Sequence, residues 1–155
     1  MSKPLKENFI IRIKSRIEQR DDTESVELMT RGSLTLRGGS YYITYRETET
    51  TGYEGCVTTL KLAADGSRVA MLRFGPANTQ LLIEKGRRNL CHYETGYGSM
   101  TLGVTADEID CALTEDGGTA TFSYLLDAGT AELVSRNCLE VTVTRANERK
   151  GLQQQ

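Results

Sequence analysis

The stretch "CHYETGYGSM" (residues 91–100) contains the only histidine of the chain, His92, close to tyrosines, a carboxylate and a serine. Side chains of these types act as general acids, general bases and nucleophiles in enzymes. Adjacent residues of a strand point to opposite faces of the sheet, so His92 and Tyr93 would not act on one substrate. We therefore expect Tyr93 to face inward and His92 to face outward beside Glu94. A catalytic His92 is the alternative.

A second set of chemically capable residues comprises an arginine, a carboxylate and several tyrosines that are far apart in the sequence. Glu47 has the alternation phase of Ile43, and Arg73 has the phase of Met71, although the run around Arg73 is apolar on both faces. A buried arginine is tolerable when a carboxylate pairs with it. We predict an interior cluster of these residues: Tyr45, Glu47, Arg73, Tyr93, Thr95 and Tyr124.

This cluster allows two interpretations. In the first, Arg73 binds a carboxylate or phosphate of a ligand in a cavity on the order of a few hundred cubic ångströms, and the tyrosines add hydrogen bonds. In the second, Glu47 neutralises Arg73, the hydroxyls satisfy the remaining groups, and the side chains fill the interior. Side chains can just fill an eight-stranded barrel, which slightly favours the second interpretation.

Cysteine spacing argues against a metal site. Cys56, Cys91, Cys111 and Cys138 are widely separated, and there is no C-x-x-C pair. With one histidine in the chain, a zinc site of ordinary spacing is absent from the sequence. We expect buried free thiols, no metal, no cofactor and no assignable catalytic residue.

The segments that must position these side chains alternate between apolar and polar residues. In "NFIIRIKSRIE" (8–18), Phe9, Ile11 and Ile13 share one face, which is typical of a half-buried strand. The strongest helical candidate, "TADEIDCAL" (105–113), offers one turn at most. Similar alternation recurs at residues 25–28, 41–46, 56–62, 119–126 and 139–144, with glycine-rich turn signals between the runs.

Many antiparallel strands with one apolar face each must bury those faces together. We therefore predict an all-β protein formed by one closed antiparallel barrel of about eight to ten strands, of the lipocalin and streptavidin type. A two-sheet sandwich is the rival fold. We expect residues 1–148 to form a single domain and residues 149–155 to form a disordered tail.

Charge and hydropathy limit the function classes. Lysine and arginine number 19 against 21 aspartate and glutamate residues, so the overall field does not attract nucleic acid or anionic lipid. The apolar run near the start, Phe9–Ile11, is too short for a signal sequence or a membrane span. We expect a cytoplasmic protein without nucleic-acid or membrane partners.

Several motifs in series are similar to a known family. The order "YYITYRETE", "GCVTTLKL", "VAMLRFG", "CHYETGYGSMTLGVT", "FSYLLDAG" and "NCLEVTVTR" resembles the YwiB-like family, domain of unknown function 1934. The resemblance runs from about Phe9 to Arg145 and implies a calycin-like β-barrel in small bacterial proteins of no assigned activity. Gly96 stands where the family pattern would place proline. The matching positions include Tyr45, Glu47, Thr58, Thr59, Arg73, Gly75, Tyr93, Thr95, Gly98, Tyr124 and Asn137.

Three hypotheses about function follow. The first is a non-enzymatic barrel that binds a small, partly apolar or anionic ligand near Arg73 and the tyrosines. The second is a filled barrel that acts through its outer surface or as a homodimer. The third is an enzyme that uses Tyr93 as acid or base on a substrate held by Arg73, which would require a lowered tyrosine pKa.

Overall fold

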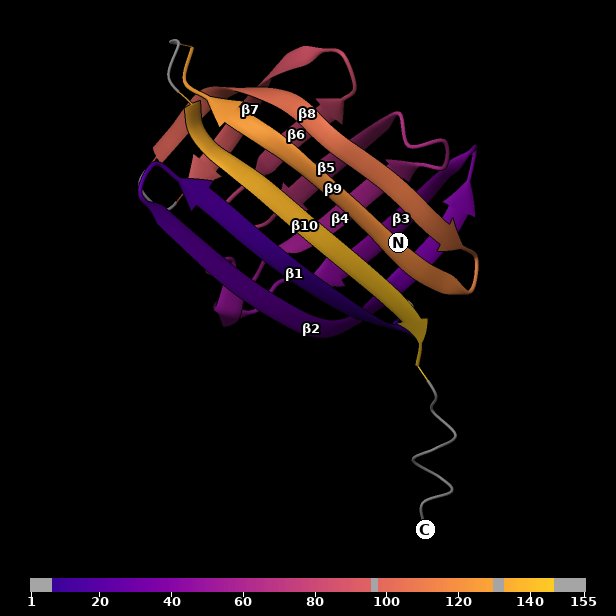
Figure 1. The fold of residues 1–155 in the computed structure, drawn as a ribbon. Helices are drawn as coiled ribbons and strands as arrows, with labels where there is room; N and C mark the ends of the chain where they lie inside the picture. The colour runs from indigo at the N-terminus through magenta and orange to yellow at the C-terminus, as the bar shows by residue number, and fades with distance from the viewer. Residues whose placement is uncertain (1–6, 96–97, 130–132, 147–155) are drawn as a thin grey trace.

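The alternating runs fold into antiparallel strands that close into a barrel (Figure 1). A computed structural model describes residues 7–95, 98–129 and 133–146. Within these residues the strands are β1 (Phe9–Gln19), β2 (Asp22–Arg37), β3 (Ser40–Arg46), β4 (Val57–Ala63), β5 (Arg68–Phe74), β6 (Thr79–Glu84), β7 (Arg88–Thr95), β8 (Gly98–Thr114), β9 (Gly117–Asp127) and β10 (Leu133–Arg145).

Strand order follows the chain, and pairing of β1 with β10 completes the circle. This arrangement confirms the predicted all-β closed antiparallel barrel and rules out the two-sheet sandwich. Figure 1 shows β1, β10, β9 and β8 side by side across one wall. The long strands of this wall pair over nearly their whole length, as in the register from Phe9↔Arg145 to Glu18↔Arg136. The likeness to lipocalins and streptavidin stays a prediction.

The predicted inward phases are confirmed. On β1 the buried residues alternate with exposed ones, because Phe9, Ile11 and Ile13 point inward while Arg12 and Lys14 point outward. The fully buried centre of the barrel consists mainly of branched aliphatic side chains, which suit the pleated surface of a sheet. They are Ile11, Ile43, Leu60, Leu62, Val69, Ile83, Val104 and Val141.

A β-bulge in β8 explains why its sequence lacks simple alternation. The register with β9 shifts between Ala106 and Glu108. Leu102 and Val104 are buried before the bulge, and Ile109 is buried after it, so the extra residue changes the inward positions from even to odd. The segment 105–113, the strongest helical candidate in the sequence, is therefore strand.

The β3–β4 connection is longer than a hairpin turn and folds back on itself. A short 3₁₀ turn (Glu49–Thr51) begins at Thr48, whose side chain accepts a hydrogen bond from the Thr50 amide. Gly52 ends the turn with a φ of 84°, a left-handed conformation that glycine adopts without steric cost. The amide of Glu47 donates to the carbonyl of Cys56 at 2.9 Å, which closes the loop at its base.

The backbone ladder is weakest between β6 and β7. In residues 79–95, all of which have a described backbone, Thr79↔Tyr93 is the single Cα pairing between these strands. Side chains take the place of the missing ladder bonds, since the Leu82 amide donates to the sulfur of Cys91 at 3.3 Å. The side-chain amide of Asn89 donates to the Leu82 carbonyl at 3.1 Å. Cys91 thus has a structural role in the wall.

The four cysteines are free, as predicted. Cys56 and Cys91 are buried, whereas Cys111 and Cys138 are only half-buried, so burial was predicted correctly for two of them. In the described part of the chain, no helix has the length and apolar character needed to cross a bilayer. The predicted tail, residues 149–155, lies outside the described residues.

Gly32 gives a direct test of the barrel geometry. Its backbone lies so close to β1 and β3 that a Cβ atom would overlap Ile11 Cδ1 and the carbonyl oxygen of Thr44. Because a backbone oxygen cannot move aside cheaply, we expect Gly32→Ala to lower the free energy of unfolding by about 2 kcal/mol or more. Urea denaturation measures this change. Ser33→Ala, the matched control on the next residue, should stay within about 0.5 kcal/mol; equal effects would contradict the close approach.

Candidate functional site

One row of paired residues carries polar side chains around the inner face of the barrel. Strand pairing places Tyr45 beside Thr58 and Thr58 beside Arg73. The row continues from Arg73 to Thr79 and then to Tyr93. Paired residues on one face of neighbouring strands lie within reach of each other, so the register alone brings these five residues together. The alternation that builds the wall thus also assembles the site.

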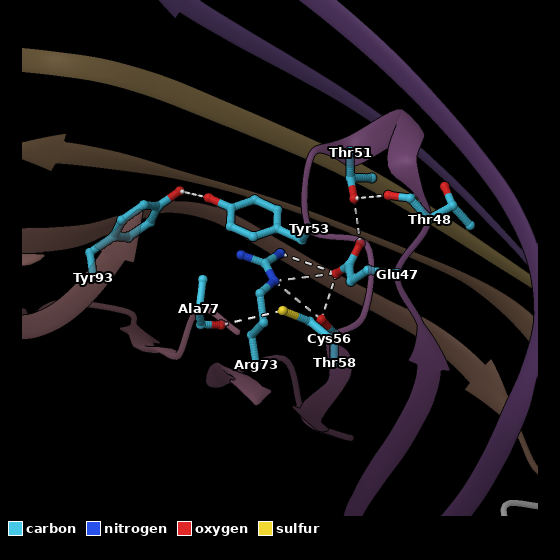
Figure 2. Close-up of polar contacts among 9 residues, drawn as sticks. All are labelled: Glu47, Thr48, Thr51, Tyr53, Cys56, Thr58, Arg73, Ala77 and Tyr93. Atoms are coloured by element: carbon cyan, nitrogen blue, oxygen red, sulfur yellow. Dashed lines mark hydrogen bonds and ion pairs between the residues drawn. The ribbon is translucent and has the colours of Figure 1, made fainter. Parts of the chain in front are cut away.

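A buried ion pair lies at the centre of this row. Nη2 of Arg73 is 3.2 Å from Oε2 of Glu47, and the two side chains are 9% and 1% exposed. Nε of Arg73 donates to the same carboxylate oxygen at 3.4 Å. The hydroxyl of Thr58 also donates to Oε2, and that of Thr51 donates to Oε1 at 2.8 Å (Figure 2). Four donors therefore satisfy the buried carboxylate.

Tyr53, from the β3–β4 connection, covers the arginine. Its ring lies against the guanidinium group of Arg73, with 3.9 Å between Cζ and the ring centroid. This contact is a cation–π interaction in a partly desolvated place, where such contacts are strongest. The Tyr53 hydroxyl is 3.3 Å from the hydroxyl of Tyr93 (Figure 2). The connection is thus held by contacts to both β5 and β7.

Burial perturbs the ionisation of these groups. It raises the pKa of Tyr45 and Tyr124, and the negative charge of Glu47 raises that of Tyr45 further. Burial and the hydrogen bond with Tyr93 raise the pKa of Tyr53. For Arg73, burial lowers the pKa, but the attraction of Glu47 and the nearby tyrosines outweighs it and leaves the pKa raised. The guanidinium group of Arg73 therefore stays charged and these tyrosines stay neutral at pH 7.

A cavity of about 140 Å³ adjoins the cluster. Tyr124 and Asn137, neighbours on β9 and β10, line the wall formed by the long strands. The interior is therefore filled over much of its length but hollow beside the polar groups, and the hollow is smaller than the few hundred cubic ångströms expected. Its apolar lining includes Ile13, Ile17, Val26, Leu28, Met71, Leu81 and Leu139.

A second, larger and more open hollow of about 1140 Å³ follows one pairing row across five strands. The row runs from Ile109 through Phe122 and Leu139 to Ser15 and Val26. Three of these residues, Ser15, Val26 and Leu139, also line the smaller cavity. Its charged lining residues are of both signs. The buried ion pair of Glu47 and Arg73 lines the smaller cavity, which is therefore the candidate site.

Five of the six predicted site residues come together. Tyr45, Glu47, Arg73, Tyr93 and Tyr124 all line the 140 Å³ cavity. The side chain of Thr95, the sixth, lies outside the described residues. His92 is on the outer face, as expected, with Nε2 at 3.5 Å from Glu94 Oε2.

Several residues of the site were not predicted. Tyr53 and Thr51 belong to a stretch whose glycines indicate only a turn, and nothing in that pattern shows that the turn folds back over the barrel. Thr79 could have been found, because it shares the inward phase of Leu81 and pairs with Arg73. Its hydroxyl is buried without a partner among the described residues. In the same part of the chain, no three metal-ligating side chains cluster together.

The ion pair can be tested by removing one partner. We expect Glu47→Ala to lower the free energy of unfolding by about 3–5 kcal/mol, because the arginine is left charged in a buried place. Glu27→Ala, which removes an exposed partner of Arg12 at 3.4 Å, should cost about 0–1 kcal/mol. Urea denaturation of both variants gives the comparison. Equal losses would mean that Glu47 and Arg73 are not mutually dependent.

The raised tyrosine pKa values predict a loss of stability at alkaline pH. In the unfolded chain these tyrosines ionise near the ordinary pKa of about 10, whereas in the folded protein they stay protonated to higher pH. The folded state then binds more protons, so the free energy of unfolding is unaffected by them below about pH 10 and decreases above it. Urea denaturation from pH 8 to pH 12 measures the slope. Tyr124→Phe should make it shallower; an unchanged slope would contradict the assignment.

Comparison with known proteins agrees with this architecture. The fold is similar to that of the crystal structure of ywiB protein from Bacillus subtilis, with a TM-score of 0.76 and 20% sequence identity over 90% of this chain and 92% of that chain. At this identity the likeness shows the fold alone. No curated protein matches the sequence. Residues 11–141 match the family described as "Domain of unknown function (DUF1934)", which confirms the resemblance found in the sequence. Because the match covers most of its length, this chain belongs to the DUF1934 family.

Proposed function

We propose that this protein is a small-molecule-binding barrel whose ligand occupies the cavity beside Arg73. The observation that carries the proposal is an incomplete set of hydrogen bonds. Nε and Nη2 of Arg73 bind Glu47, but Nη1 has no protein partner within the described residues. Figure 2 shows this nitrogen on the side of the guanidinium group away from Glu47. Among the described residues, the side-chain atom that is buried without a partner is the Thr79 hydroxyl, so Nη1 is accessible from the cavity that Arg73 lines, and a molecule there can accept a hydrogen bond from it.

Other walls of the cavity add to this polar contact. Tyr93 and Tyr124 line it from β7 and β9, while aliphatic side chains such as Leu28 and Leu81 supply the apolar surface. A few convergent polar groups in a mostly apolar hollow are typical of ligand sites. A cavity of about 150 Å³ accommodates benzene in another protein, so 140 Å³ suits a molecule with one ring or a short chain.

The enzyme hypothesis has less support. It assigns the role of acid or base to Tyr93, and the surroundings of this residue do not favour a tyrosinate, since burial raises the pKa of the neighbouring Tyr53 and Tyr124. A surface role as a homodimer has one favourable observation. Leu82 and Leu90 are 37% and 68% exposed on the neighbouring strands β6 and β7. Exposed leucines occur singly on most proteins, so this alternative ranks second.

Native mass spectrometry of the protein purified from its own cells tests the proposal. We expect a bound small molecule, and we expect Ser15→Leu to reduce its occupancy about tenfold or more, because the added side chain fills the cavity. Ser25→Leu, at an exposed position of β2, is the matched control and should retain the molecule. A ligand-free protein, or equal occupancy in both variants, would contradict the proposal. The same spectrum gives the subunit number, and a ligand-free dimer would favour the surface role.

A further inference from the structure

We infer that the cavity selects a neutral ligand that presents a hydrogen-bond acceptor, such as an amide or a ketone, over an anion of the same shape. This inference rests on the proposed function and specifies its ligand. It also departs from the sequence-based expectation that Arg73 would bind a carboxylate or phosphate. The reason is the charge already present beside the arginine.

The charges that line the cavity cancel. Glu47 and Arg73 contribute one negative and one positive charge, both nearly inaccessible to water. Arg16 is the third charged lining residue, but its neighbours Ser15 and Ile17 occupy the inward phase, and its Nε is 3.0 Å from Glu18 Oε2 at the surface. An anionic ligand would therefore be a buried charge without a counter-charge of its own, which is strongly unfavourable.

Exchange of partners would not help an anion. For a ligand carboxylate to take Arg73, the guanidinium group would have to leave Glu47. The carboxylate of Glu47, whose side chain is 1% exposed, would then keep neutral hydroxyl donors, among them Thr51 and Thr58, and no counter-charge. Removing one partner of a buried pair is far more costly than keeping the pair. The ion pair is thus a fixed part of the cavity wall, and the ligand can form hydrogen bonds only with the polar groups that the pair leaves free.

What remains is rich in donors. Nη1 of Arg73 can only donate. The hydroxyl of Tyr124 has no protein partner within the described residues, and it can donate or accept. A carbonyl oxygen, with two lone pairs, suits such a set without bringing charge into the interior.

Benzamide and benzoate are matched probes, because they have nearly the same shape and differ in charge at pH 7. We expect NMR titration of the wild-type protein to show that benzamide binds about tenfold or more tightly than benzoate. The cost of burying one uncompensated charge is more than enough to produce this ratio. Tyr124→Phe should weaken benzamide binding. Glu47→Gln should reverse the preference, because this nearly isosteric change leaves the charge of Arg73 uncompensated.

The outcomes separate the inference from the proposed function. Wild-type protein that binds benzoate as tightly as benzamide would overturn the inference and leave a binding site in place. Failure of both probes to bind at millimolar concentration would count against the proposed function itself. If Glu47→Gln does not fold, the benzamide-to-benzoate ratio of the wild-type protein still decides between a neutral and an anionic ligand.

Discussion

The buried ion pair between Glu47 and Arg73 is the interaction on which the polar end of the barrel depends. Either charge alone would lose its hydration at a cost of several kcal/mol, so neither side chain is tolerable inside without the other. Together they have a good geometry, with two guanidinium nitrogens directed at one carboxylate oxygen and two threonine hydroxyls completing the set. The ion pair therefore holds the side chains of Thr51 and Thr58 in place beside it.

The pair also ties together segments that strand pairing alone would not. Glu47 directly follows β3, Arg73 belongs to β5, and Thr51 comes from the connection between β3 and β4. The carboxylate accepts hydrogen bonds from β5, from the connection and, through Thr58, from β4. The connection is therefore drawn over the barrel interior, where Tyr53 covers the arginine and reaches Tyr93. One electrostatic contact thus positions a loop, and the loop completes a wall of the cavity.

Alternation was sufficient to predict the barrel and most of the site, because a period of two assigns each strand residue to one face. Glu47 was placed inside for that reason. The run around Arg73 is apolar on both faces, so its inward phase was predicted together with a carboxylate partner, which lies 26 residues away in the sequence. The same argument failed where the period is interrupted. The bulge near Asp107 reverses the phase within β8, and Tyr53 lies in a turn, whose direction depends on tertiary contacts. Cavity volume depends on side-chain packing, which a pattern of residue types does not contain.

The contrast between the two parts of the interior indicates why the polar cluster is present. Away from it, the chain fills the barrel with residues such as Ile43, Leu60 and Val69, which are completely buried. Buried ion pairs are often no more stabilising than apolar residues of similar volume, so stability alone does not call for the cluster. Its groups also leave hydrogen bonds incomplete at Arg73 and Thr79. Aliphatic side chains could have filled this part of the barrel as well. The chain instead keeps hydrogen-bond donors and a balanced pair of charges beside a cavity, and a molecule in that cavity could complete the missing hydrogen bonds.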